Sequence, residues 1–475
     1  MGAAHALSRL ARVVVTALAT AACGPRVLPP LGEVVVVVDT DLPVPRVASV
    51  LRVDTYEVDG AWIESREIAL RDPRDWPASF SIQAADDTRD RAVVVRVRVH
   101  GGRTRDATGP ARLVVGGADV TPPSEPEPLL AVDRLSLVVL RPGERARLQI
   151  TARASCAGVP ARLEPGAYAS CLEGEGTLEP VAASSLEPEL SLPTASSAGS
   201  AARTPCASPG PSERPCVEGG AFLLGSEDLQ IVPDPALPPA PQRLARVSTF
   251  TIDRDEITVA RFRGAVARGF VPPDLPGVTE GELGTTAKTT CAYSATPRGR
   301  EAYAMTCVTW STARAYCQRA GGDLPTEAQW EYAATSAGRA GTTTFPWGDD
   351  APDCARAIYG RLALAGLPGS CEAAAGSGPR AAANGDGTPL APGDLAAVGV
   401  RGLGGGVAEW MRDAPRGYES AGWREVDPVS LDPRATAHVV RGGAWASTAI
   451  NVRSAARTAA SKAASFIGFR CVYAP

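Results

Sequence analysis

Hydrophobic residues between positions 33 and 155 occur in short runs separated by polar turns, and no helical spacing interrupts them. Residues 34–38 are five consecutive valines, which suit a strand buried on both faces. Residues 95–99 alternate Val and Arg, which is the period of a strand with one buried face. The pattern predicts an all-β sandwich of about seven strands, whose other runs are at 49–58, 79–84, 111–117, 135–140 and 146–152.

Helical spacing begins only after residue 250, where three short helices are predicted. The first is predicted to begin after Thr258 as its N-cap and to end at Gly269. Its apolar face would consist of Val259, Phe262 and Val266. The second covers residues 310–321, and the third follows a capping box formed by Thr326 and Gln329. Gly, Trp and Pro dominate the intervening chain, so we expect a compact α+β domain over residues 216–475 with little regular secondary structure.

Two further segments differ in composition from both domains. Residues 173–215 are rich in Ser, Ala, Pro and Glu, which predicts a disordered linker because such a segment buries little apolar surface. An ordered loop of this length would be uncommon. At the N-terminus, Arg9 and Arg12 precede an apolar run at 13–22 that ends in small residues before Cys23. This run is too short to span a bilayer.

The order of residues 1–23 is that of a secretory signal, and it resembles the bacterial lipoprotein signal, in which the cysteine becomes the lipid anchor. Thr20 stands where such signals usually carry Leu. The alternative is an ordinary secretory signal with an incidental cysteine. We expect an exported protein of the cell envelope, with lipid on Cys23 attaching it to a membrane.

The amino-acid composition limits the disulfides, metal sites and catalytic groups that this chain can form. Setting Cys23 aside from the 11 cysteines leaves ten, an even number that favours disulfides in an exported protein. Cys156 with Cys171 and Cys354 with Cys371 are natural local pairs. A formal net charge of −4 implies no nucleic-acid partner. Only three histidines are present, which excludes a His-rich metal site and disfavours a Ser-His-Asp triad.

Several segments occur in an order typical of one family. They include "GGAFLLGSED", "CVTWSTARAYCQRAGGDLPTEAQWEYAA" followed by "FPWGDD", "GLGGGVAEWMRD", "VVRGGAW" and "IGFRC". Together, over roughly residues 218–473, they resemble the sulfatase-modifying factor family, whose named member is the formylglycine-generating enzyme. The resemblance implies a C-type-lectin-like fold of short helices and strands.

The resemblance also locates a reactive centre. In the active oxidase, two cysteines between the "RGG" and "AAR" elements bind Cu(I), which prefers thiolate ligands. This chain has no cysteine between Cys371 and Cys471. Copper and oxidase activity are therefore not expected, and no cofactor is required. The pocket candidates at the lost cysteine region are Trp445, Ser447, Asn451 and Arg453.

Calcium is the one candidate metal that the resemblance implies. Its ligands would be Glu409 and the carbonyl groups of Gly405 and Val407, since hard cations prefer oxygen. Gly402 stands where the family has an Asn or Asp ligand, and Ile358 stands where a second site expects Asn. The alternative is that Glu409 orders its loop by accepting backbone hydrogen bonds.

The resemblance also implies two disulfides of the C-terminal domain. Cys471 occupies a structural disulfide position, and its expected partner is Cys291 or Cys307. The family would join Cys317 to a cysteine just before "AAR". Because Ser454 stands there, Cys317 must pair differently or stay free.

Three functions follow from these observations. The first is a surface lipoprotein whose C-terminal domain is a binding or structural module for a protein or glycan ligand. The second is an enzyme of the same fold with different chemistry at residues 445–453. The third is an adhesion or assembly protein that acts through the β-sandwich.

Overall fold

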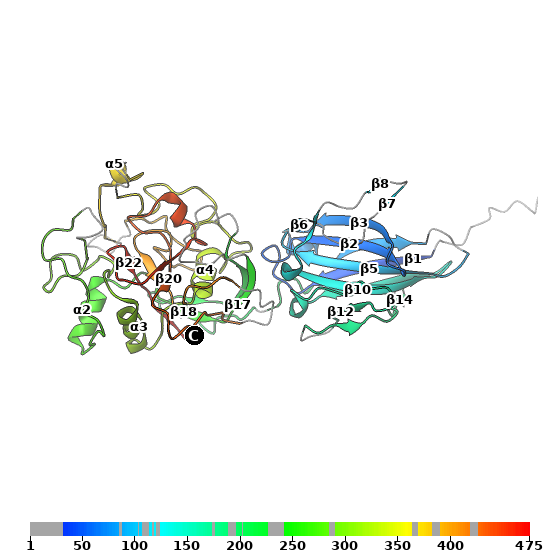
Figure 1. Cartoon of the computed structure of the whole chain (residues 1–475), viewed down its shortest axis with the longest axis horizontal. Helices are drawn as coiled ribbons and strands as arrows, with labels where there is room; N and C mark the ends of the chain where they lie inside the picture. The colour runs from blue at the N-terminus through cyan, green and yellow to red at the C-terminus, as the bar shows by residue number, and fades with distance from the viewer. Residues whose placement is uncertain are drawn as a thin grey trace, which may run out of the picture.

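The structure is a computed structural model. It describes residues 32–84, 88–102, 104–106, 114–115, 118–119, 124–172, 176–188, 196–201, 203–226, 242–284, 290–362, 369–381, 390–418 and 426–475. The predicted signal segment, residues 1–23, lies outside them. Figure 1 shows a β-rich N-terminal part and a C-terminal part of short helices, short strands and irregular chain. No helix in the described ranges has the length and apolar character needed to cross a membrane.

The N-terminal part is a sandwich of two four-stranded sheets, which confirms the predicted architecture. One sheet has the order β14–β11–β1–β4, with bounds Glu187–Pro188, Arg145–Ala152, Glu33–Thr40 and Ala78–Gln83. The other has the order β10–β5–β2–β3, with bounds Ala131–Leu140, Arg91–His100, Val50–Glu57 and Trp62–Ala69.

The shared core of the sandwich explains the valine pattern. Val34, Val36 and Val38 of β1 are buried in the same cluster as Val95 and Val97 of β5. β1 pairs with β11 in parallel and with β4 antiparallel. It is therefore an inner strand, as a run of valines buried on both faces requires.

The arginines that alternate with the β5 valines do not face open solvent. Arg98 is buried and pairs with buried Asp54 of β2 at 2.6 Å. Arg52 donates to the carbonyl of Ser124 in β9 (Ser124–Pro126), which pairs with β6 (Thr104–Asp106). The two-stranded sheet of β6 and β9 thus covers part of this polar face, which the alternating pattern alone does not reveal.

Two strand predictions in the sandwich need correction. The described residues of the run at 111–117 do not join either large sheet. Its described residues form β7 (Val114–Val115), which pairs with β8 (Ala118–Asp119). β3 was not expected, because its sequence, WIESREIA, contains few apolar residues, and only partly buried positions hold it at the sheet edge.

Several described residues of the segment 173–215, for which a disordered linker was expected, form strand pairs and hydrogen bonds. β13 (Glu179–Pro180) pairs with β12 (Ala169–Ser170), and β14 extends the first sheet. Ser197 donates to the Asp39 carboxylate through its hydroxyl, at 2.9 Å, and its backbone N–H, at 2.8 Å. Hydrogen bonds and a disulfide at Cys206 order this polar segment with little apolar burial.

The described residues of the C-terminal part include the short helices α2, α3, α4 and α5, with bounds Val259–Ala267, Trp310–Arg319, Glu327–Thr335 and Glu372–Ala375. The three predicted helices are confirmed. The capping box of α4 forms as expected, and Thr258 caps α2. Val266 does not belong to the buried face of α2, since it is 38% exposed.

In the part of this domain that the structure describes, the strands form three small sheets. Their strand orders are β21–β20–β19–β22, β15–β18–β23 and β16–β17. The bounds in chain order are β15 Cys216–Val217, β16 Gly220–Leu224, β17 Arg243–Val247, β18 Phe250–Ile252, β19 Ala408–Trp410, β20 His438–Arg441, β21 Arg457–Ala460, β22 Ile467–Gly468 and β23 Val472–Tyr473. The fold is therefore α+β, and β18 with β23 joins the beginning of the domain to the end of the chain.

All ten cysteines of the described ranges form disulfides. Cys156–Cys171 and Cys354–Cys371 confirm the two predicted local pairs. The other three bridges are Cys206–Cys216, Cys291–Cys307 and Cys317–Cys471.

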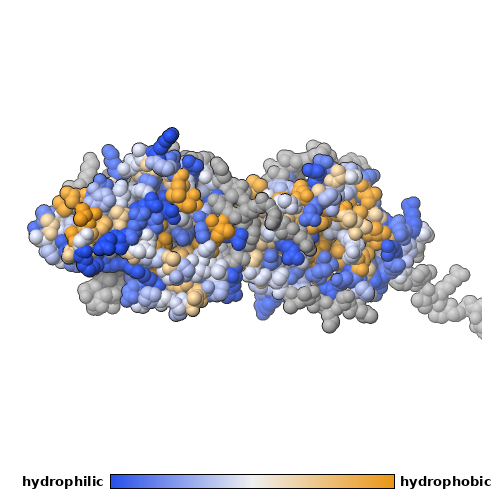
Figure 2. Space-filling view, turned by 90° about the horizontal axis from the view of Figure 1, so that it is seen from below, coloured by the Kyte–Doolittle hydropathy of each residue, from blue (hydrophilic) through white to orange (hydrophobic). Residues whose placement is uncertain are grey.

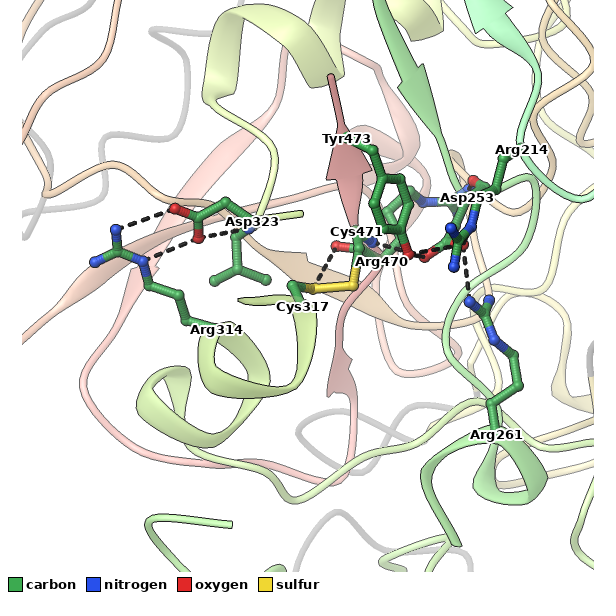
Figure 3. The surroundings of a disulfide bond; sticks show 10 residues. Arg214, Asp253, Arg261, Arg314, Cys317, Asp323, Arg470, Cys471 and Tyr473 are labelled. Carbon is green, nitrogen blue, oxygen red and sulfur yellow. Dashed lines mark hydrogen bonds and ion pairs between the residues drawn. A yellow bond between two sulfur atoms is a disulfide. The ribbon is translucent and has the colours of Figure 1, made fainter. Parts of the chain in front are cut away.

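The expected bridge from Cys471 to Cys291 or Cys307 is therefore wrong. Figure 3 shows Cys471 joined to Cys317 at the end of α3. Backbone hydrogen bonds between Val472 and Asp323 hold β23 beside the turn that follows α3, which brings these two cysteines together. Asp323 in turn accepts from Arg314 of α3.

On the face of the molecule in Figure 2, hydrophilic and hydrophobic residues are interspersed over both parts of the chain. This distribution agrees with a mean hydropathy of −0.04. Scattered apolar residues on a surface are ordinary and need no ligand to explain them.

Candidate functional site

The interval that follows β20 carries the predicted pocket residues. Trp445 is 1% exposed, and its backbone N–H donates to the carbonyl of Gly406 at 2.9 Å. Its indole N–H donates to the carbonyl of Ser465 at 3.3 Å. Trp445 therefore connects this interval to the loop before β19.

The three polar candidates of the interval do not join Trp445. The Ser447 hydroxyl accepts the N–H of Ala444 at 2.9 Å and so closes its own turn. Asn451 lies in a 3₁₀ turn, Ala449–Val452, and its N–H donates to the carbonyl of Thr448. Asn451 and Arg453 are half-buried. Of these four residues, Trp445 is the one that lines the cavity described below.

The two arginines that flank the interval have structural partners. Arg441 is fully buried and donates to Glu331 at 2.6 Å, to Glu327 at 3.0 Å and to the Tyr418 hydroxyl at 2.7 Å. Arg457 donates to both carboxylate oxygens of Glu327 at 2.6 and 2.9 Å. The "RGG" and "AAR" elements therefore anchor the interval to helix α4.

The pKa values of the two buried glutamates in this network depend on burial and on the neighbouring arginines. Burial by itself would raise the pKa of Glu327, but the adjacent guanidinium groups of Arg457 and Arg441 outweigh it and lower that pKa. Burial raises the pKa of Glu331. The sequence analysis did not identify these two glutamates, because a glutamate on a helix is normally exposed to solvent. Their burial was indicated only by their position on the face of α4 that is otherwise occupied by Ala and Trp.

Glu409 has a different environment from the expected calcium ligand. The guanidinium of Arg470 donates to both of its oxygens at 2.7 to 2.9 Å, and the indole N–H of Trp330 donates at 2.9 Å. A Cβ at Gly405 would lie 2.7 Å from the backbone nitrogen of Ile358, so this part of the loop packs directly on that residue. In the described structure, Glu409 therefore accepts hydrogen bonds from the side chains of Arg470 and Trp330.

A small cavity of about 40 Å³ lies next to this loop. Its wall combines the residues before α2, the loop 401–407 and Trp445. Glu256 is 3% exposed, and burial raises the pKa of its carboxyl group to about 8. Asp394, also buried, accepts the N–H of Gly404 at 3.0 Å, and burial raises its pKa to about 7.

Sequence reasoning did not find these two acids. Glu256 stands in "DRDEITV", where three acidic residues within four positions look like a solvated turn. Asp394 lies in a Gly- and Pro-rich stretch without periodicity. Only tertiary contacts place both beside the loop 401–407, so no local signal distinguished them.

His438 is structural, as expected for a lone histidine in this half of the chain. Its ring stacks on Trp310 with the centroids 3.6 Å apart and the planes 4° apart. Burial, together with the positive charge of Arg314, lowers the pKa of His438 to about 4. Within the described ranges, no three residues among His, Cys, Asp and Glu lie together as a metal site.

The C-terminal part is an α+β domain with short helices, short strands, much irregular backbone and several disulfides. Comparison with known sequences identifies its family. The "Sulfatase-modifying factor enzyme 1-like domain" matches residues 205–475, more than half of the chain. The protein belongs to this sulfatase-modifying factor family, which confirms the resemblance and the α+β fold expected from it.

Two curated relatives are formylglycine-generating enzymes. The chain is 29% identical over 301 residues to that of Thermomonospora curvata, covering 54% of this chain and 92% of the relative. It is 31% identical over 168 residues to that of Mycobacterium tuberculosis, covering 28% of this chain and 53% of the relative.

Solved structures with a similar fold are more distant in sequence. PvdO from Pseudomonas aeruginosa is 19% identical, with a TM-score of 0.40, and the match covers 55% of this chain and 94% of PvdO. Variable protein 1 of Treponema denticola is 17% identical, with a TM-score of 0.37, over 55% of this chain and 95% of that protein.

Proposed function

We propose that the C-terminal domain is a binding module that has lost the copper oxidase chemistry of the formylglycine-generating enzymes. One observation carries this proposal: each of the ten cysteines in the described ranges is held in a disulfide. None of them lies between Cys371 and Cys471. A pair of thiolates for Cu(I) is therefore not available in this domain.

The remaining polar groups of the interval support the same conclusion. Hydroxyl and amide oxygens are poor ligands for Cu(I), which prefers sulfur. The Ser447 hydroxyl already accepts a backbone hydrogen bond, and Thr448 is an exposed residue. The Ser447 hydroxyl thus stabilises the backbone of its own turn.

Copper content and aldehyde formation test the proposal directly. Purified protein is loaded with Cu(I), desalted and assayed for bound metal, and then incubated with a "C-x-P-x-R" peptide. We expect no stoichiometric copper and no aldehyde above a heat-inactivated control, while the Thermomonospora curvata enzyme converts the same peptide. Copper-dependent aldehyde formation by this protein would refute the proposal.

We further propose that the module is exported and anchored through lipid on Cys23. The five disulfides support export, because structural disulfides are rare in the reducing cytosol. A labelled fatty acid should mark the protein in cells, and Cys23→Ser should abolish the label. Cys206→Ser, the same exchange elsewhere in the chain, should keep it. Label that persists in Cys23→Ser would contradict the anchor.

A further inference from the structure

One hairpin of the C-terminal part, β16 with β17, has two covered faces. The two strands pair so that Phe222 lies opposite Ala245 and Leu223 lies opposite Leu244. Successive side chains of a strand point to opposite faces of the sheet. Phe222 and Ala245 are buried in the core of the C-terminal part, together with residues of α4. The other face of the hairpin, which carries Ala221, Leu223 and Leu244, therefore points away from that core.

The β-sandwich covers this second face of the hairpin. Ala221 is 0% exposed and Leu244 is 2% exposed, and both belong to the same buried cluster as the valines of β1 and β5. Leu223 packs against this cluster, and a Cβ at Gly101, just after β5, would lie 3.5 Å from the Leu223 side chain. Figure 1 shows β17 on the side of the C-terminal part that faces the sandwich. The hairpin thus contributes side chains to the cores of both parts.

An arginine of the sandwich adds hydrogen bonds to this apolar contact. Arg46, in the turn between β1 and β2, donates to the carbonyl of Ala221 at 3.3 Å and to the carbonyl of Arg339. Its guanidinium carbon also lies 5.8 Å from the centroid of the Tyr332 ring in α4. All three partners belong to the C-terminal part, so one charged side chain spans the junction. Hydrogen bonds from a charged donor are stronger than those between neutral groups.

The segment that connects the two parts is bonded to both of them. The N–H of Ala201 donates to the carbonyl of Asp41, just after β1, at 2.9 Å. Thr204 exchanges two backbone hydrogen bonds with Gly219, at 2.8 and 3.3 Å, and so belongs to the C-terminal part. The disulfide Cys206–Cys216 closes the loop that follows. Because the two attachment points are only three positions apart in the chain, the connection leaves little length for a hinge.

We propose that the sandwich and the C-terminal part form one rigid, cooperatively folded unit, joined by the β16–β17 hairpin and by Arg46. Domains of one chain generally move relative to each other unless an apolar interface holds them, and the shared cluster supplies that interface. The sandwich is then a fixed support that the C-terminal part needs in order to bury its hairpin. This inference goes beyond the proposed binding function, and it depends neither on the loss of copper chemistry nor on the lipid anchor.

Trypsin cleavage after Arg203 measures how often the junction opens. The Arg203 side chain is 71% exposed, but the bond to Thr204 can be cut only when Thr204 leaves Gly219. With the full-length chain, Arg46→Ala should be cleaved there at least about tenfold faster than the wild type, because cleavage follows the population of the open form and two carbonyl groups lose a charged donor. Arg74→Ala, the same exchange at a side chain that is 90% exposed on the sandwich, should be cleaved like the wild type. Equal rates for the two variants would overturn the proposal.

Hydrogen exchange of the non-reduced full-length chain in urea, read by mass spectrometry, tests the cooperative folding with a substitution inside the sandwich. Val97→Ala removes methyl groups from the sandwich core, where Val97 is 0% exposed. It should lower the urea midpoint of peptides from both parts by the same amount, because one cooperative unit has one transition. Val58→Ala, the same exchange at a side chain that is 47% exposed, should leave both midpoints unchanged. A midpoint that falls only in the sandwich peptides would overturn the proposal, as would wild-type parts that unfold at different urea concentrations.

Discussion

Replacing Arg470 by methionine would remove the only cation bonded to Glu409 in the described structure. The guanidinium is 0% exposed and makes hydrogen bonds to Glu409 and to three carbonyl groups. Methionine has a similar volume but no donor. The variant would therefore leave a buried carboxylate without its partner, next to the equally buried Glu256.

The expected loss of stability is large. Removing one partner of a buried ion pair typically costs about 3–5 kcal/mol, because the other charge remains in a medium of low polarity. Three unpaired carbonyl groups would add to this cost. Since domains are stable by only about 5–15 kcal/mol, Arg470→Met should bring the C-terminal domain close to unfolding.

Urea unfolding under non-reducing conditions, followed by tryptophan fluorescence, measures this loss. Two of the eight tryptophans, Trp62 and Trp76, precede residue 300, so the signal comes mainly from the C-terminal domain. Arg298→Met is the matched control. Arg298 pairs with Glu280 at 3.1 Å, but both side chains are about half exposed, at 45% and 46%. Its loss should be below about 1 kcal/mol.

A double variant separates charge from packing. Arg470→Met combined with Glu409→Gln removes the unpaired charge and should recover part of the stability lost in Arg470→Met. The reasoning would be refuted if Arg470→Met and Arg298→Met lost the same small amount. It would also be refuted if the double variant were no more stable than Arg470→Met, because the buried charge would then not be the cause.

Two further predictions concern the C-terminal domain. Mass mapping of non-reduced peptides should find Cys317 joined to Cys471, and a bridge from Cys471 to any other cysteine would contradict the structure. His438 should make stability depend on pH: burial lowers its folded pKa to about 4 from 6.5, so stability falls as pH decreases through this window. Its partial exposure limits the effect to about 1 kcal/mol. His438→Phe keeps an aromatic ring on Trp310 and should flatten this dependence relative to the wild type; equal slopes would show that His438 does not titrate in this way.

Local sequence patterns predicted the structure correctly where the stabilising interactions lie within one short segment of the chain. The α4 capping box depends on residues three positions apart, and both of its hydrogen bonds form as predicted. The valines of β1 and β5 indicate buried strands, because burial on alternate positions is a property of the strand itself. The disulfides Cys156–Cys171 and Cys354–Cys371 also join cysteines close in sequence.

Patterns were insufficient where order comes from a distant partner. The Ser-rich segment before residue 215 contains few apolar residues, and Asp39, more than 150 positions away, supplies the carboxylate that holds Ser196 and Ser197. Glu409 likewise accepts hydrogen bonds from Arg470, which is 61 positions later in the chain. In both cases the polar partner lies too far away in the sequence for a local pattern to reveal it.

The sequence by itself determined the sandwich, the three short helices, the family and the absence of cysteines at the oxidase centre. Those properties depend on residue type, on short spacing and on the order of motifs. Tertiary structure alone decided the Cys317–Cys471 bridge and the pairing of Arg470 with Glu409 rather than Glu256. Buried charges are stabilised or left unbalanced by whichever groups the fold brings within hydrogen-bonding distance, and that distance is a property of the folded chain.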